Sequence, residues 1–353
     1  MFEDAKTRSE TGCAGAAPEE RAQPGRFGAN TSKAFDLYQA AVDASKLVAG
    51  RRARRNAKSR MVGVRAHFLV KRRPLPAFLI IGTMRGGTSS LFKYLESHPD
   101  TAASLRKEVN YFTRFWQKGP DWYRAHFPIT RRRLAFEASP NYLFHPLAAM
   151  RAEATVPNAK LIVLLREPAA RARSHYDHMV RLGFERRCFI RALESESRLV
   201  HDALVRFDED QHIWQPMFLR HSYLSRGYYA DQLERWLSFF PVENLLVLWS
   251  EDFFAKPSEA LDRISEFLSI SPRRFSGVDR NYSIPAVVQK DTPARTAEAM
   301  PAWAIARLQQ ENTRFLELLR RRLPHVGLPP WLMESAQSAS DPSGTFAQVA
   351  RVG

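Results

Sequence analysis

Residues 82–90 combine glycines, hydroxyl groups and one cation in a pattern that can bind an anion. Glycines let a backbone turn tightly and come close to a ligand, so that its N–H groups can act as donors. Arg85 adds a positive charge inside the turn. The whole segment reads Gly82, Thr83, Met84, Arg85, Gly86, Gly87, Thr88, Ser89 and Ser90. We therefore expect this stretch to bind a phosphate group.

The residues on either side predict the elements that would position this loop. Phe78–Ile81 is a short apolar run, which is typical of a buried strand. Residues 91–98 read as a helix, and Thr88, Ser89 or Ser90 could cap it. A helix N-terminus offers unpaired N–H groups and the positive end of the helix dipole. The sequence predicts a strand–loop–helix cradle for phosphate, and an ordinary strand-to-helix turn is the alternative.

The same loop partly matches the Walker A motif of nucleoside triphosphatases. Gly82, Gly87 and Ser89 fit the spacing of that motif. Thr88, however, stands where the motif needs the lysine that reaches the β- and γ-phosphates, and the cation of this loop is Arg85. Such a loop suits a ligand without a γ-phosphate. The pattern weakens the hypothesis of a nucleotide kinase or ATPase without excluding it.

A second apolar run, Leu161–Leu165, predicts another buried strand, and Arg166 follows it. A Walker B strand would end in an acidic residue that holds magnesium. Open α/β sheets bind ligands at the carboxyl ends of their strands, which is where Arg166 is expected. Ser174 comes eight residues later on the next predicted helix. An arginine fork and a hydroxyl so placed could hold a further phosphate, and a surface arginine with an ordinary helical serine is the alternative.

Lys107 and Glu108 form a charged pair directly before the apolar and aromatic stretch Val109–Phe112. Charged pairs of this kind are frequent at protein surfaces. The pair alone therefore does not indicate a function.

Composition and charge limit the classes of function. The chain has 353 residues, a net charge of +16 and two cysteines, Cys13 and Cys188. We find no disulfide framework, no His/Cys pattern for a metal, no apolar run long enough to cross a membrane and no signal-peptide pattern. These features predict a cytoplasmic protein. The charge is uneven, because residues 51–73 hold ten basic residues and no acidic one.

Such a basic segment attracts polyanions, and it could hold the protein at the periphery of an anionic membrane surface. A solvated leader is the alternative. The interleaved aromatic residues of a single-strand binder are missing, so we expect no nucleic-acid partner.

Strands that alternate with helices predict an α/β fold, a three-layer sandwich on a mainly parallel central sheet. Strands are expected at 78–81, 135–142, 160–165 and 244–249, and helices at 33–49, 91–98, 117–128, 146–155, 169–182, 184–214, 222–240, 257–268 and 302–322. Residues 1–30 and 336–353 are expected to be disordered, 31–75 to form a basic helical extension, and 76–335 to form the catalytic domain.

With its motifs in this order, the chain resembles the sulfotransferases that use 3′-phosphoadenylyl sulfate (PAPS), especially the heparan-sulfate-type branch and its bacterial relatives. The resemblance covers about residues 76–331. Ile80–Ser90 is similar to the loop that binds the 5′-phosphosulfate, and Arg166 and Ser174 match the residues that bind the 3′-phosphate. Lys107–Phe112 is similar to the segment whose glutamate is the catalytic base. Two further stretches, 137–142 and 227–237, follow the order of the family.

The resemblance implies an O-sulfotransferase that moves the sulfuryl group of PAPS to an acceptor hydroxyl, releases 3′,5′-adenosine bisphosphate (PAP) and needs no metal. Glu108 would take the proton of the hydroxyl, and Arg85 and Lys107 would neutralise developing charge. The acceptor would be a polysaccharide, a glycolipid or a small molecule. A nucleotide kinase, and a degenerate sulfotransferase fold that only binds ligands, remain the alternatives.

The sequence departs from the family in two places. Arg85 stands where well-known members carry a lysine, and because arginine is a poor proton donor it could act only as an electrostatic clamp, unless Lys107 shares the role. Residues 271–301 lack the cysteines that close a loop in the heparan-type enzymes. Lys290 is our candidate for the PAPS contact made by that loop.

Overall fold

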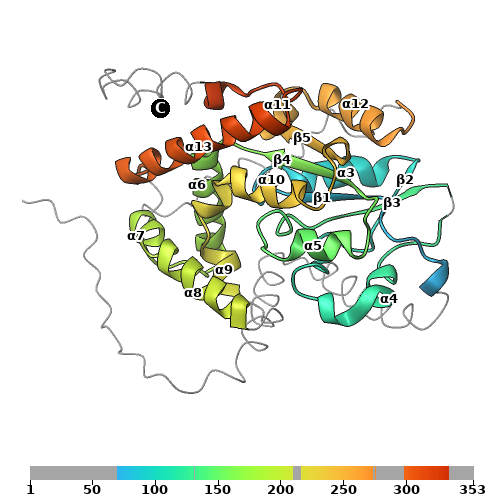
Figure 1. Ribbon diagram of the computed structural model, residues 1–353, viewed down its shortest axis with the longest axis horizontal. Helices are drawn as coiled ribbons and strands as arrows, with labels where there is room; N and C mark the ends of the chain where they lie inside the picture. The colour runs from blue at the N-terminus through green and yellow to red at the C-terminus, as the bar shows by residue number, and fades with distance from the viewer. Residues whose placement is uncertain (1–69, 131, 210–215, 273–274, 276–297, 334–353) are drawn as a thin grey trace, which may run out of the picture.

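The computed structural model describes residues 70–130, 132–209, 216–272, 275 and 298–333 (Figure 1). The predicted disordered segments 1–30 and 336–353, the predicted helix 33–49 and Lys290 lie outside these residues. Of the basic segment 51–73, the structure describes the 3-10 helix η1 (Val70–Arg72) and Arg73.

Within the described residues, five parallel strands form one sheet in the order β2-β3-β1-β4-β5 (Figure 1). They are β1 (Phe78–Gly82), β2 (Thr101–Ala103), β3 (Leu134–Ala138), β4 (Lys160–Leu165) and β5 (Leu245–Trp249). Ile80 of β1 lies opposite Ala138 of β3 and Ile162 of β4. The carboxyl ends of the three central strands therefore meet at one edge, where α/β sheets bind ligands.

Both faces of the sheet are covered by helices, which explains why β1 is buried along its whole length. Phe78 and Ile80 face a cluster formed with α3 (Thr88–Ser97), α11 (Ser250–Ala255) and α12 (Pro257–Leu268). Leu79 and Ile81 face the opposite cluster, which includes residues of α4 (Gly119–Arg124), α5 (Ala148–Glu153), α10 (Tyr229–Leu237) and α13 (Ala302–Arg322). This arrangement confirms the predicted three-layer α/β sandwich.

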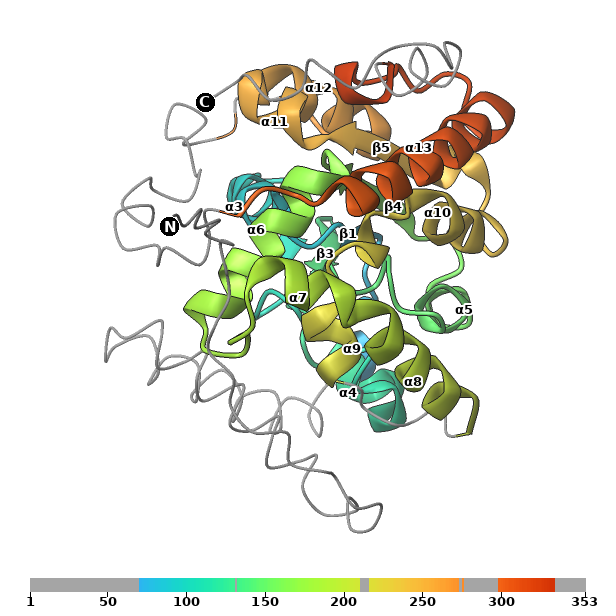
Figure 2. The same ribbon diagram turned by 90° about the vertical axis from the view of Figure 1, so that its left-hand side faces the viewer.

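A further group of helices lies beside α6 (Pro168–Arg181), as Figure 2 shows. It consists of α7 (Phe189–Glu194), α8 (Glu196–Glu209) and α9 (Pro216–His221). The remaining short elements are η2 (Trp116–Lys118), η3 (Ser225–Gly227) and η4 (Val242–Asn244).

Four predicted helices are shorter than expected: 117–128 is α-helical only as α4 and 146–155 only as α5, and the other two are 184–214 and 222–240. In its described part, the segment 184–214 contains two helices, α7 and α8, and 222–240 becomes α-helical as α10 only at Tyr229. The Glu196 side chain links the last two of these segments. The Glu196 carboxylate accepts hydrogen bonds from the amides of Leu224 (2.6 Å) and Ser225 (2.8 Å), and so holds η3 against the start of α8. These contacts join distant segments, and helical periodicity does not report them.

Candidate active site

The loop between β1 and α3 is a strand–turn–helix junction, as the sequence predicts. The helix begins earlier than expected, so Thr88, Ser89 and Ser90 lie in its first turn and do not cap it. The N-cap is Gly87, whose φ of 101° is a left-handed conformation that glycine adopts without steric cost. The hydroxyl groups therefore lie at the helix start, beside the turn.

The turn is held at several points by neighbouring elements. Thr83 N donates to Leu164 O of β4 (2.8 Å), and the Ser250 hydroxyl donates to Gly86 O (2.7 Å). A Cβ atom on Gly86 would lie 2.6 Å from Leu164 O, so the loop can rest on β4 in this way only with glycine at that position. Sequence reasoning missed Ser250, which comes from the start of α11.

The loop presents a series of backbone amides that can bind an anion. Among the described residues, no protein group accepts a hydrogen bond from the amides of Met84, Arg85, Gly87, Thr88 and Ser89. The last two belong to the first turn of α3, where backbone N–H groups have no partner within the helix. Together with the helix dipole, these donors form a cradle of the kind that holds phosphate.

Arg85, Arg166 and Ser174 come together although they belong to three separate elements. The Arg85 Nε donates to the Ser174 Oγ at 3.0 Å, and the Arg166 Nη1 donates to the Arg85 carbonyl oxygen at 3.3 Å. Burial and the neighbouring guanidinium groups of Arg181 and Arg166 lower the pKa of Arg85 to about 10. Positive charge is therefore concentrated beside the loop.

Tyr229 fixes the turn that carries Arg166, and sequence reasoning missed this role. Its hydroxyl donates to Arg166 O at 2.7 Å and accepts from Arg166 N at 3.4 Å. The side chain is fully buried, and burial raises the pKa of Tyr229, which keeps the hydroxyl protonated. The sequence placed Tyr229 only on the apolar face of its helix.

Lys107 and Glu108 form an ion pair at the same edge of the sheet. The Lys107 Nζ lies 3.0 Å from a Glu108 carboxylate oxygen, and the Glu108 side chain is 47% exposed. The backbone amide of Glu108 donates to Ala138 O at 2.9 Å, which places Glu108 at the end of β3. Since Ala138 lies opposite Ile80, the pair is near the loop that follows β1.

A buried network holds the segment that carries Glu108. The Glu137 carboxylate accepts hydrogen bonds from Ser139 (2.6 Å), Tyr142 (2.6 Å) and Tyr123 (2.8 Å). The hydroxyls of Ser139 and Tyr142 in turn accept from the amides of residues 110 (3.0 Å) and 111 (2.8 Å). Burial raises the pKa of Glu137, and these hydrogen bonds oppose the shift. The carboxylate is thus a positioning group.

The structure does not bring every predicted residue to the site as a side chain. Met84 packs against the apolar cluster around Ala172 and Tyr176, so only its backbone amide faces the loop. A Cβ on Gly82 would lie 2.7 Å from the Leu143 Cβ, which indicates close packing. Lys290 lies outside the described residues.

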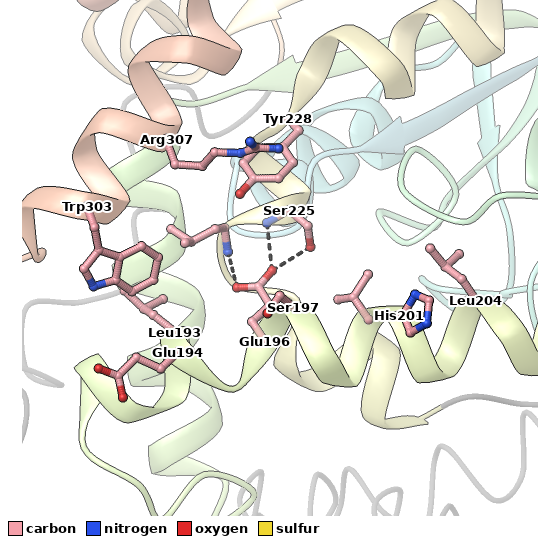
Figure 3. Close-up of a pocket in the computed structure, with 12 residues that line it drawn as sticks. Leu193, Glu194, Glu196, Ser197, His201, Leu204, Ser225, Tyr228, Trp303 and Arg307 are labelled. Atoms are coloured by element: carbon pink, nitrogen blue, oxygen red, sulfur yellow. Dashed lines mark hydrogen bonds between the residues drawn. The ribbon is translucent and has the colours of Figure 1, made fainter.

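A separate cavity of about 740 Å³ lies between α8, η3 and the start of α13 (Figure 3). It is lined by Leu193, Glu194, Glu196, Ser197, Val200, His201, Leu204, Leu224, Ser225, Tyr228, Trp303 and Arg307. Its central charged groups are engaged, because Glu196 binds Leu224 and Ser225, and Arg307 pairs with Glu311 at 3.0 Å. None of the predicted site residues lines it, so the candidate site remains the one at the sheet edge.

Among the described residues, no group of three or more His, Cys, Asp or Glu side chains is arranged to hold a metal ion. No helix in the same residues is long and apolar enough to cross a membrane.

Comparison with known proteins gives a consistent result. The family described as the sulfotransferase domain matches residues 75–303. The chain is 27% identical to the membrane-associated sulfotransferase kil1 of Dictyostelium discoideum, over 70% of this chain and 66% of that protein. It is 31% identical to the human heparan sulfate glucosamine 3-O-sulfotransferase 6, over 56% of this chain and 54% of that protein.

A further curated relative and a solved structure are also sulfotransferases by name. The mouse bifunctional heparan sulfate N-deacetylase/N-sulfotransferase 3 is 31% identical over 56% of this chain and 23% of that protein. The chain thus spans less than two thirds of each of these curated relatives. The crystal structure of a sulfotransferase from Alicyclobacillus acidocaldarius is similar with a TM-score of 0.53 and 28% identity, over 71% of this chain and 98% of that one.

Proposed function

Because this chain belongs to the sulfotransferase domain family, we propose that it transfers the sulfuryl group of PAPS to an acceptor hydroxyl and releases PAP. One observation carries the proposal. Arg166 and Ser174 meet the glycine-rich loop through Arg85, at the sheet edge that also holds the Lys107–Glu108 pair. Two anion sites and a carboxylate base are what this reaction requires.

The donor would occupy both anion sites. The amides of Met84, Arg85, Gly87, Thr88 and Ser89, with the hydroxyls at the start of α3, would bind the 5′-phosphosulfate. Arg166 and Ser174 would bind the 3′-phosphate, through an arginine fork and a hydroxyl. A donor with a 3′-phosphate and no γ-phosphate also fits a loop that has Thr88 in place of the Walker lysine.

Transfer would proceed by in-line displacement at sulfur. The Glu108 carboxylate takes the proton of the acceptor hydroxyl while its oxygen forms a bond to sulfur. The bond between sulfur and the bridging oxygen of the phosphate breaks, and PAP leaves with that electron pair. General-base catalysis of this kind contributes about 10²–10⁴-fold. Lys107, 3.0 Å from Glu108, would neutralise charge that develops on the sulfuryl oxygens.

The acceptor that we propose is a hydroxyl group of a carbohydrate, as part of a polysaccharide or a glycolipid. The support comes from relatives named as heparan sulfate sulfotransferases, one of them a 3-O-sulfotransferase. The half-exposed Glu108 is accessible to a large acceptor. A small hydroxylated molecule is the second candidate.

Titration calorimetry with PAP, followed by transfer of labelled sulfate from PAPS to a panel of acceptors, tests the proposal. We expect PAP to bind and labelled carbohydrate to form. Absence of PAP binding, or magnesium-dependent hydrolysis of ATP in its place, would overturn the proposal in favour of a nucleotide kinase-like protein. Binding of PAP without turnover on any acceptor would favour a binding protein.

A further inference from the structure

We propose that Arg85 is a specificity residue for the 3′-phosphate of the donor, so that its guanidinium completes the site of Arg166 and Ser174. The inference rests on the proposed function, because that function supplies a ligand with a 3′-phosphate. It goes further by assigning the loop's one cation to the far end of the donor instead of to the transferred sulfuryl group.

The direction of the Arg85 side chain is the first observation. Its Nε donates to the Ser174 Oγ at 3.0 Å, across the space between the loop and α6. Within the described part of the chain, the two Nη groups of Arg85 donate no hydrogen bond. Ser174 accepts from Arg85 and keeps its own proton for donation. The guanidinium fork and the hydroxyl are therefore both available to one phosphate.

The backbone of Arg85 is the second observation. Its φ of 73° lies in the left-handed region, which is unfavourable for a residue with a Cβ atom. The Arg166 Nη1 donates to the carbonyl oxygen of this residue at 3.3 Å. Tyr229 holds the backbone of Arg166 in turn. Arg85 is thus held in place by the residue that we assign to the 3′-phosphate.

Electrostatics give the third observation. Burial, together with the positive charges of Arg181 and Arg166, lowers the pKa of Arg85 to about 10, and Asp177 is the opposing charge. Like charges that gather out of water favour an anionic ligand. A phosphate monoester is close to a dianion at pH 7, whereas a sulfuryl group carries one negative charge. The cluster therefore complements a phosphate better than a sulfuryl group.

The assignment divides the basic residues of the site by task. Lys107, which pairs with Glu108 at 3.0 Å, remains beside the transfer reaction. Arg85 lies with Arg166 and Ser174 at the end where the donor is recognised. A lysine at position 85 could not serve in the same way, because it has no Nε donor and no planar fork.

Calorimetric titration with two nucleotides that differ only in the 3′-phosphate, PAP and 5′-AMP, tests this inference. For Arg85→Met we expect the dissociation constant of PAP to rise about 10- to 100-fold, as for a lost hydrogen bond to a charged group. The dissociation constant of AMP should change less than about 3-fold, which is no more than a weak neutral hydrogen bond contributes to binding. An equal loss for both nucleotides would overturn the inference.

Three further variants make the result specific. Arg191→Met removes an exposed arginine that pairs with Glu194 on α7, and it should leave both affinities unchanged. Arg85→Lys keeps the positive charge and replaces Arg85→Met in the test if that variant does not fold. It should weaken the binding of PAP and leave the binding of AMP unchanged. The double variant Arg85→Met/Ser174→Ala should lose less free energy of PAP binding than the sum of the losses in the two single variants. Strictly additive losses would contradict a phosphate shared by the two side chains.

The affinities of the wild-type protein for PAP and AMP distinguish a wrong donor from a wrong assignment of Arg85. If it binds PAP no more tightly than AMP, the proposed donor is wrong and the inference falls with it. If it prefers PAP and Arg85→Met keeps that preference unchanged, only the assignment of Arg85 is overturned.

Discussion

Arg85 and Glu108 share an unusual feature at the level of the single residue. Both have positive φ angles, 73° and 62°, although neither is glycine. Such conformations cost roughly 1–3 kcal/mol and persist where surrounding contacts maintain them. Here Arg166 binds the carbonyl oxygen of Arg85, and Ala138 accepts from the amide of Glu108. The protein therefore maintains strained backbone at the two positions to which we assign donor recognition and base catalysis.

Glu108→Gln tests the role of the base. The amide keeps the size of the side chain and cannot accept a proton at neutral pH. We expect the rate of sulfuryl transfer in a single turnover to fall about 10²–10⁴-fold, while the affinity for PAP changes little. Glu194→Gln, at an exposed position of α7, is the control. Parallel loss of rate and of PAP affinity would show that Glu108 has a different role.

Arg166→Ala tests the second phosphate site. The change removes the fork and the hydrogen bond to Arg85 O. We expect binding of PAP to weaken by about 1.5–3 kcal/mol, the range for a hydrogen bond to a charged partner. Arg166→Lys keeps the charge without the fork. Its affinity for PAP, measured by calorimetric titration, should lie between those of the wild-type protein and Arg166→Ala. An unchanged affinity in Arg166→Ala would remove Arg166 from the site.

At the level of the element, the end of β3 holds the segment that carries Lys107 and Glu108. Glu137 is fully buried and its carboxylate binds three hydroxyl groups, two of which also accept from backbone amides next to Glu108. A buried network of this kind is rigid because every lost bond leaves a polar group without water. The position of Glu108 thus depends on hydrogen bonds that its segment makes with the end of β3 and the turn after it.

Ser139→Ala tests this positioning. It removes the bond to Glu137 and the acceptor for the amide of Asn110, so we expect a loss of about 1–3 kcal/mol in the free energy of unfolding. The rate of transfer should also fall, while PAP affinity is retained. Ser265→Ala removes a buried hydroxyl from α12, which binds Leu261 O, and should change stability alone. Equal rates of transfer in Ser139→Ala and Ser265→Ala would contradict a role of Ser139 in positioning Glu108.

At the level of the whole molecule, burial of histidines makes stability depend on pH. Burial, followed by the charges of Arg151, Arg235 and Arg226, lowers the pKa of His145 to about 3. Burial and neighbouring arginines also hold the pKa of His175 well below its usual range. Between pH 6.5 and 3 the unfolded chain binds more protons than the folded one at these positions. Stability is therefore expected to fall as the pH falls through that window.

His145→Asn tests this dependence. Asparagine keeps an acceptor near the position of Nδ1, which accepts from the amide of Leu147. Because the variant lacks this titrating group, its free energy of unfolding should depend less steeply on pH. We expect the slope between pH 4 and 6 to fall by about 1.4 kcal/mol per pH unit. Urea unfolding across that range measures it, with His201→Asn at an exposed position of α8 as the control. Equal slopes in both variants would contradict the assignment.

Much of the fold could be predicted from the sequence, because burial on a sheet or a helix face leaves a local pattern. The apolar runs predicted the strands β1, β4 and β5, and α12 and α13 have the predicted bounds. The strand β2 was missed since Thr101–Ala103 has no apolar run and is a strand only through its pairing with β3. Edge strands of this length have no signal of their own.

The sequence by itself determined the types of residue at the candidate site and the elements that carry them: a glycine-rich loop after a buried strand, an arginine after another, and a Lys–Glu pair. Only the tertiary structure decided which of them meet. Arg85 and Ser174 are 89 positions apart, and their contact depends on the parallel alignment of β1 with β4, which sets the loop against α6. Periodicity is local, whereas the register between strands is not. That register directs the Arg85 side chain toward Ser174.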